Sequence, residues 1–178
     1  MKFIRIGNKT VSLEKILLAV EDILEMRGRG FSQQDIAEKI GIDRSFVSRL
    51  ECIGEIRKGQ SVGFIAFPVK NKSEVIKLIG QYGVDFHIVM TEEERNTFVK
   101  EKSGVELLNS VMGLITEARN LDTIIVFASD KRGRLIEALL DCQVIRKDIG
   151  QSPITSDVYV SLDEIKQIFD ALQLTSNL

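Results

Sequence analysis

Two arginines and two serines near residue 45 have the types and spacing to hydrogen-bond a regular array of polar groups. Arg44 and Ser48 are four residues apart, as are Ser45 and Arg49, so the four side chains form one strip on a helix. A guanidinium can donate two hydrogen bonds to O6 and N7 of guanine, and a hydroxyl can bond base edges or phosphates. The strip therefore predicts a helix that contacts the major groove of double-stranded DNA.

The surrounding segment, residues 31–51, has the pattern of two short helices joined by a tight turn. Ser32 is a favourable N-cap, and Asp35 lies in the first turn, where a carboxylate suits the helix dipole. Gly41 can adopt the left-handed backbone that such a turn needs, and Asp43 can cap the second helix. These signals predict a helix-turn-helix whose recognition helix covers about residues 44–52.

The apolar residues of the segment are spaced to bury one face of each helix. They are Ile36, Ala37 and Ile40 on the first helix, and Val47 and Leu50 on the second. The small Ala37 lets two steeply crossing helices approach closely. At the start of the first helix, Gln33 can bring its amide and the free N–H groups of the helix to a phosphate.

The segment resembles the helix-turn-helix of the phage-repressor (Xre-type) family of transcription regulators. The likeness lies in a Gln after the cap, a small residue four positions on, a Gly at the turn and a Ser-Arg-Leu-Glu end. It implies that Gln33 clamps the DNA backbone and that the recognition positions are Arg44, Ser45, Ser48 and Arg49. In that family an Arg seven residues before the Gln commonly pairs with the final Glu. Here Met26 holds that position with Arg27 beside it, so we expect a different partner arrangement for Glu51.

Charge is unevenly distributed along the chain, which has a net charge of −2. Residues 1–60 carry 11 Lys and Arg against 9 Asp and Glu, whereas residues 61–178 carry 13 against 17. The half with the helix-turn-helix pattern is therefore at +2 and the other half at −4. Local rather than total charge governs contact with phosphates, so the acidic total does not exclude DNA binding.

Few residues offer chemistry of another kind. Cys52, Cys142 and the lone His87 are too few and too far apart for a structural zinc site, which needs about four ligands. Phosphate-binding glycine loops and nucleophile motifs are absent from the sequence. We therefore expect no catalytic residues, no metal and no cofactor.

The period of the apolar pattern changes near residue 60. Before it the pattern is helical, with Ser12 capping a first helix whose apolar face is Leu13, Ile16, Leu17, Val20, Ile23 and Leu24. After a turn or linker at 57–60, apolar runs predict strands at 62–67, 84–90, 123–128, 143–147 and 157–160. Amphipathic segments predict helices at 73–81, from 91, and at 105–119, 130–140 and 163–172.

This alternation predicts an α/β protein with two domains. Residues 1–60 would form an all-α helix-turn-helix module, and residues 61–178 a three-layer, Rossmann-like domain with a mostly parallel sheet. Ligands of such sheets bind beyond the carboxyl ends of the strands. There the segment Ser129, Lys131, Arg132 and Gly133 offers a helix N-terminus with two cations, so we regard it as a candidate site for a small-molecule effector.

Taken together, the sequence predicts a sequence-specific DNA-binding transcription regulator that acts as a homodimer. The second domain would assemble the dimer, with the amphipathic segment Val105 to Ile115 as part of the contact. A charge within the first apolar stretch argues against a signal peptide, so we expect a cytoplasmic protein without a membrane partner. Two alternatives stay open: a small α/β enzyme or ligand-binding protein with an accessory helical module, and an antitoxin-like protein-docking module.

Overall fold

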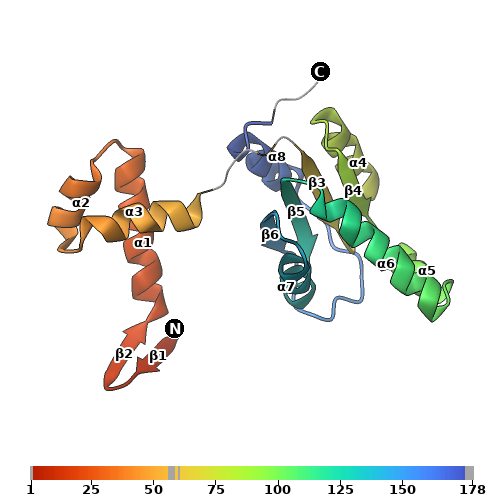
Figure 1. The fold of residues 1–178 in the computed structure, drawn as a ribbon, viewed down its shortest axis with the longest axis horizontal. Helices are drawn as coiled ribbons and strands as arrows, with labels where there is room; N and C mark the ends of the chain where they lie inside the picture. Colours follow the sequence, from red (N-terminus) through yellow and green to blue (C-terminus); the bar gives the residue numbers. More distant parts are fainter. Residues whose placement is uncertain (1, 56–58, 60, 175–178) are drawn as a thin grey trace. The chain divides into compact units, whose positions relative to one another are not determined.

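The chain forms two compact units, Met1–Glu55 and Ile56–Leu178, in the computed structural model shown in Figure 1. The structure describes residues 2–55, 59 and 61–174. The domain boundary expected at residue 60 and the linker expected at 57–60 fall largely on residues 56–58 and 60, outside those described. Each unit has a hydrophobic core of its own.

The first unit contains three helices preceded by a β-hairpin. Strands β1 (Phe3–Ile6) and β2 (Lys9–Ser12) pair antiparallel, and helices α1 (Leu13–Gly28), α2 (Gln33–Ile40) and α3 (Arg44–Gly54) follow. The apolar pattern of residues 1–60 predicts only helices here. The sequence signal for the hairpin is the dipeptide Gly7-Asn8. Gly7 has φ +58°, a positive φ of the kind that two-residue hairpin loops require.

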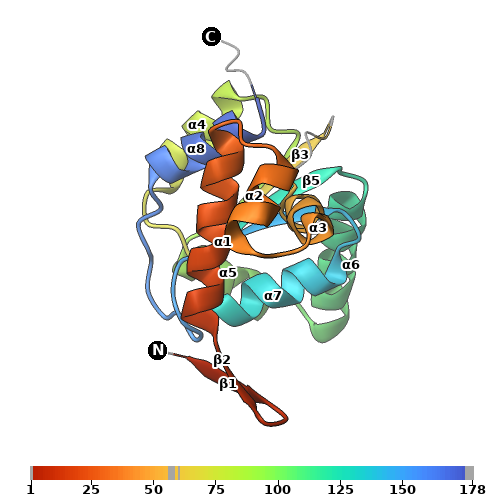
Figure 2. The ribbon, with the colours of Figure 1, turned by 90° about the vertical axis from the view of Figure 1, so that its left-hand side faces the viewer.

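The core of the first unit lies between α2, α3 and the second half of α1. Ile23, Ile36 and Val47 are buried, and Met26, Ile42 and Leu50 pack around them. Figure 2 shows α2 and α3 beside the end of α1 that is remote from the hairpin. The first half of α1 is therefore uncovered, and its apolar residues Ile16 and Leu17 are 44% and 60% exposed.

The second unit is built on a four-stranded sheet, as Figure 1 shows. Strands β3 (Val62–Ala66), β4 (Phe86–Val89), β5 (Thr123–Ala128) and β6 (Gln143–Asp148) run in the order β4-β3-β5-β6. All three neighbouring pairs are parallel, which confirms the predicted sheet. The fifth strand expected at 157–160 is only an isolated parallel bridge between Val69 and Val158.

Helices cover both faces of this sheet and give it three layers. Helices α4 (Lys72–Gln81) and α8 (Leu162–Ala171) cover one face, where Phe64, Phe127 and Phe169 meet in the core. Helices α6 (Gly104–Arg119) and α7 (Asp130–Leu139) cover the other face, and α5 (Glu92–Lys100) follows β4. The α/β class predicted from the alternating pattern is thus confirmed.

Candidate nucleic-acid interface

The start of α2 and the turn between α2 and α3 are fixed by short-range hydrogen bonds and backbone conformations that the sequence encodes. The Ser32 hydroxyl accepts from the backbone N–H of Asp35, whose carboxylate accepts in return from the N–H of Ser32. Gly41 ends α2 with φ 76° and ψ 39°, in the left-handed region. Asp43 caps α3 by accepting from the Ser45 N–H at 2.7 Å. The angle at which α3 leaves α2 is therefore fixed by its own residues.

The outer face of α3 presents the strip that the spacing predicted. Arg44, Ser45 and Arg49 are exposed and Ser48 is half-buried, while Val47 on the opposite side is fully buried. Within the described part of the chain, neither Arg44 nor Arg49 has an ion-pair or hydrogen-bond partner. Two unpaired guanidinium groups thus share one helix face with two hydroxyls, which is a donor array suited to an anionic or acceptor-rich ligand.

Glu51 fixes α3 to both other helices. Its Oε1 accepts from Arg27 Nε of α1, and its Oε2 accepts from Gln33 Nε2 of α2 at 2.8 Å. Arg27 also donates through Nη1 to the Phe31 carbonyl at 2.5 Å. The basic partner of Glu51 is therefore Arg27, one position beyond Met26. Since the Arg27 and Glu51 side chains are 32% and 31% exposed, the contact is partly shielded from water.

Gln33 has a narrower role in this arrangement than the sequence suggested. Its amide nitrogen is bonded to Glu51, so that donor is not available to a phosphate. The backbone N–H groups of Gln33 and Gln34, at the start of α2, have no bonding partner among residues 2–55. A phosphate placed at this helix N-terminus would therefore meet backbone donors first. That Gln33 clamps the DNA backbone stays a prediction. In the structure, its side chain helps to position α3 through Glu51.

Glu51 makes the stability of the first unit depend on pH. Hydrogen bonds from Arg27 and then Gln33 lower the pKa of Glu51 below its ordinary value. A carboxylate whose pKa is lowered by folding stabilises the folded state at pH values above its pKa in the unfolded chain. This contribution is lost as the pH falls through its pKa in the folded state. We therefore expect Glu51→Gln to reduce the urea midpoint of unfolding at pH 7, and to reduce it much less at pH 3. Circular dichroism of the full chain would measure both; an equal reduction at the two pH values would contradict this role.

Two apolar side chains also lie on the exposed side of α3. Phe46 is 49% exposed and Ile53 is 85% exposed, and Phe46 does not join the core around Ile23. A phenylalanine at position 46 could either contact a thymine methyl or pack against Ile53 and α1. Its exposure favours the first. Cys52 is likewise exposed, as a free thiol.

The predicted anion site at the start of α7 is closed by another part of the chain. The backbone N–H of Asp130 donates to the Gly150 carbonyl at 3.1 Å, and that of Lys131 donates to Ser152 Oγ at 3.3 Å. Ser152 Oγ also donates to Ser129 Oγ at 2.8 Å, and Ser129 is only 1% exposed. The helix N-terminus is therefore satisfied internally, and Ser129 and Lys131 do not form an open cradle for a ligand.

The other two residues of that predicted site have different surroundings. Gly133 lies against β6, because a Cβ there would come within 2.6 Å of Arg146 Cδ. Its role is close packing of α7 on the sheet. Arg132 is half-buried, and its Nη1 is shielded from solvent without a hydrogen-bond partner among the described residues. Of the predicted set, Arg132 alone retains an unused donor in a shielded position.

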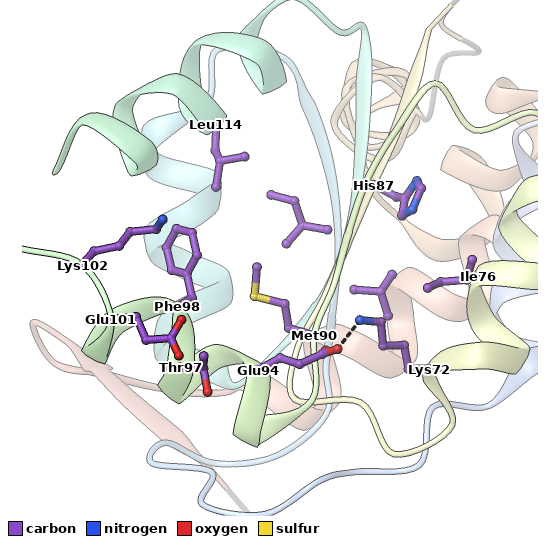
Figure 3. Close-up of a pocket in the computed structure, with 12 residues that line it drawn as sticks. Lys72, Ile76, His87, Met90, Glu94, Thr97, Phe98, Glu101, Lys102 and Leu114 are labelled. Carbon is purple, nitrogen blue, oxygen red and sulfur yellow. Dashed lines mark hydrogen bonds and ion pairs between the residues drawn. The ribbon is translucent and has the colours of Figure 1, made fainter. Parts of the chain in front are cut away.

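A cavity of about 570 Å³ lies beside the edge strand β4 (Figure 3). Lys72 Nζ and Glu94 Oε1 form an ion pair of 2.5 Å at its rim, and Lys102 Nζ lies 5.2 Å from the centre of the Phe98 ring. His87 is exposed on this strand. Within the described ranges, no three His, Cys, Asp or Glu side chains gather where they could hold a metal ion. Of the charged residues that line this cavity, Lys72 and Glu94 neutralise each other.

The helix-turn-helix surface and the α/β unit thus differ in what they offer a ligand. Among the described residues, the first presents two unpaired arginines on one helix face, and the edge cavity of the second presents a Lys72–Glu94 ion pair. Comparison with known proteins adds nothing to either: no protein-family model, curated protein or solved structure matches this chain.

Proposed function

We propose that this chain is a sequence-specific, double-stranded DNA-binding transcription regulator that places α3 in the major groove. The observation that carries the proposal is the exposed strip of Arg44, Ser45, Ser48 and Arg49. The strip lies on a helix whose orientation is set by the Gly41 turn and by the bonds of Glu51. A rigid helix with unpaired arginines at its outer face is what direct readout of guanine edges requires.

The structure around the strip suits contact with a duplex in two further respects. Phe46 is an apolar group beside the arginines, and a thymine methyl is the apolar feature of the major groove. The N-terminus of α2 offers free backbone N–H groups, which bind phosphates independently of sequence. The resemblance of this segment to the phage-repressor family supports the same assignment.

The proposal includes a homodimer, because two recognition helices about 34–36 Å apart read inverted half-sites. Helix α6 is the candidate contact in the second unit. Val105, Leu108 and Met112 are 71%, 61% and 53% exposed, and they recur at spacings of three and four residues. No charged residue occurs between positions 107 and 116. Depletion of charge around exposed apolar side chains is typical of the centre of a protein–protein interface.

Leu108→Glu should therefore convert the dimer to a monomer, because each copy would bring a carboxylate into the centre of an apolar contact. Leu17→Glu is the matched control, since Leu17 is 60% exposed on α1 of the other unit. Sedimentation velocity at micromolar concentration would distinguish the two. If Leu17→Glu dissociates the dimer and Leu108→Glu does not, the contact lies on α1 instead.

The proposed function also implies where in the cell the protein acts. Among the described residues, no helix is both long and apolar enough to cross a membrane. A transcription regulator acts where the DNA is, and for this chain we infer the cytoplasm.

Fluorescence anisotropy with a labelled random-sequence duplex at several salt concentrations tests the proposal. We expect binding at low salt whose log affinity falls linearly with log salt, by about 0.9 for each phosphate contacted. An unlabelled single strand of the same length should compete poorly. Absence of binding even at low salt would overturn the proposal. It would favour the two alternatives, a protein-docking module or an α/β enzyme with a helical accessory module.

A further inference from the structure

A second hollow of the α/β unit has a lining unlike that of the edge cavity. It measures about 280 Å³ and lies between α6 and α7, lined by Val111, Leu114 and Ile115 on one side and Leu135, Ile136 and Leu139 on the other. Among the described residues that line it, Arg95 is the one charged side chain. We call this hollow the α6–α7 groove. None of the described side chains fills it, so it is an apolar space with one cation in its lining.

Arg132 does not itself line the groove, but it is near Arg95 and Glu92, and the charges of both residues act on its guanidinium. Leu135 and Ile136 follow Arg132 by three and four residues, so the three side chains share one face of α7. Arg95 is itself neutralised by Glu92, whose two carboxylate oxygens accept from Arg95 Nε at 2.9 Å and Nη2 at 2.5 Å. Two guanidinium groups and one carboxylate therefore meet here, which leaves one positive charge in excess.

The excess charge resides on Arg132. Burial and then the neighbouring Arg95 lower the pKa of Arg132, whereas Glu92 acts in the opposite direction. Its Nη1 is shielded from solvent and has no partner in the described part of the chain. A shielded guanidinium N–H without an acceptor is unfavourable, and an anionic oxygen beside it would remove the deficit.

We propose that the α6–α7 groove binds a small monocarboxylate with an apolar body, whose carboxylate bonds Arg132. The apolar body lies between α6 and α7, and the carboxylate supplies both the missing acceptor and the missing negative charge. The ligand should be smaller than a typical drug-sized molecule, because the groove of about 280 Å³ lies just below the roughly 300–1,000 Å³ of pockets that bind those. This site goes beyond the proposed DNA binding and does not depend on it.

Isothermal titration calorimetry of the full chain without DNA tests this site with octanoate and with octanamide as its uncharged counterpart. We expect octanoate to bind saturably at one site per chain, and octanamide to bind at least tenfold more weakly, since it lacks the charge that Arg132 would neutralise. No saturable octanoate binding at millimolar concentration, or equal affinity for the two probes, would overturn the proposal.

Three variants locate the site. Arg132→Met keeps apolar bulk and removes the charge, so it should weaken octanoate binding at least tenfold and leave octanamide binding nearly unchanged. Arg134→Met, on an exposed position of the same helix, should bind octanoate like the unchanged chain. Val111→Phe adds a ring to the groove wall and should exclude both probes; because it leaves Arg132 in place, it tests the groove even if Arg132→Met fails to fold. Unchanged octanoate affinity in folded Arg132→Met or in Val111→Phe would overturn the assignment.

Discussion

Replacing Arg44 and Arg49 together by alanine should weaken binding to a duplex selected for this protein by about 30-fold or more. Each well-placed arginine contact to a base contributes about 1–3 kcal/mol of discrimination, and about 1.4 kcal/mol corresponds to a factor of ten. Both arginines are exposed and, in the described structure, unpaired, so their removal leaves no buried partner unsatisfied. Fluorescence anisotropy on the selected duplex measures the loss.

The matched control removes two positive charges elsewhere. Lys77 of α4 and Lys131 of α7 are exposed, and their side chains form no ion pair among the described residues. The variant Lys77→Ala/Lys131→Ala should therefore bind the selected duplex within about twofold of the unchanged protein, at an ionic strength that screens distant charges. If the two double variants lose affinity equally, the loss reflects net charge and the role of α3 is contradicted.

Ile36→Ala should unfold the first unit and abolish DNA binding while the α/β unit stays folded. Ile36 is fully buried, and truncation of a buried Ile to Ala costs about 2–5 kcal/mol. A unit of this size is stabilised by only about 3–8 kcal/mol in total. The α/β unit has a separate core around Phe64 and Phe127, which the substitution does not touch.

Amide resonances of the two units in a heteronuclear NMR spectrum would report their folding separately. Ile40→Ala is the control, because Ile40 lies on the same helix but is 37% exposed and has less contact to lose. Its first-unit resonances should stay dispersed. If Ile36→Ala also collapses the resonances of the α/β unit, the chain folds as one cooperative body and the division into two units is contradicted.

Local signals made much of this structure predictable. The caps at Ser32 and Asp43 and the turn at Gly41 involve residues no more than four positions apart, so the sequence shows them directly. The apolar runs of the strands similarly predict a parallel sheet between helices. The apolar pattern did not predict the hairpin. Its Gly7-Asn8 turn joins two short strands, and β1 is exposed at every residue, so no apolar alternation marks it.

Contacts between distant residues account for what was not predictable. The start of α7 has the composition of an anion site, but Ser152, which lies 21 positions from Lys131, already occupies it. The closing contact of Glu51 with Gln33 spans 18 positions and could not be inferred from helix patterns. The exposure of Ile16 and Leu17 depends on how far α2 and α3 extend along α1, and periodicity does not encode that extent.

The most direct test of the central claim is a double-mutant cycle between Arg44 and a guanine of the selected duplex. Replacing that guanine by 7-deazaguanine removes the N7 acceptor and leaves base pairing intact. If Arg44 reads this base, the modified duplex should bind the unchanged protein about tenfold more weakly, and should bind Arg44→Ala as well as the unmodified duplex does. If 7-deazaguanine weakens both proteins equally, Arg44 does not read a guanine N7. If 7-deazaguanine at every guanine of the site weakens neither protein, no guanine N7 is read and the proposed docking of α3 in the major groove is contradicted.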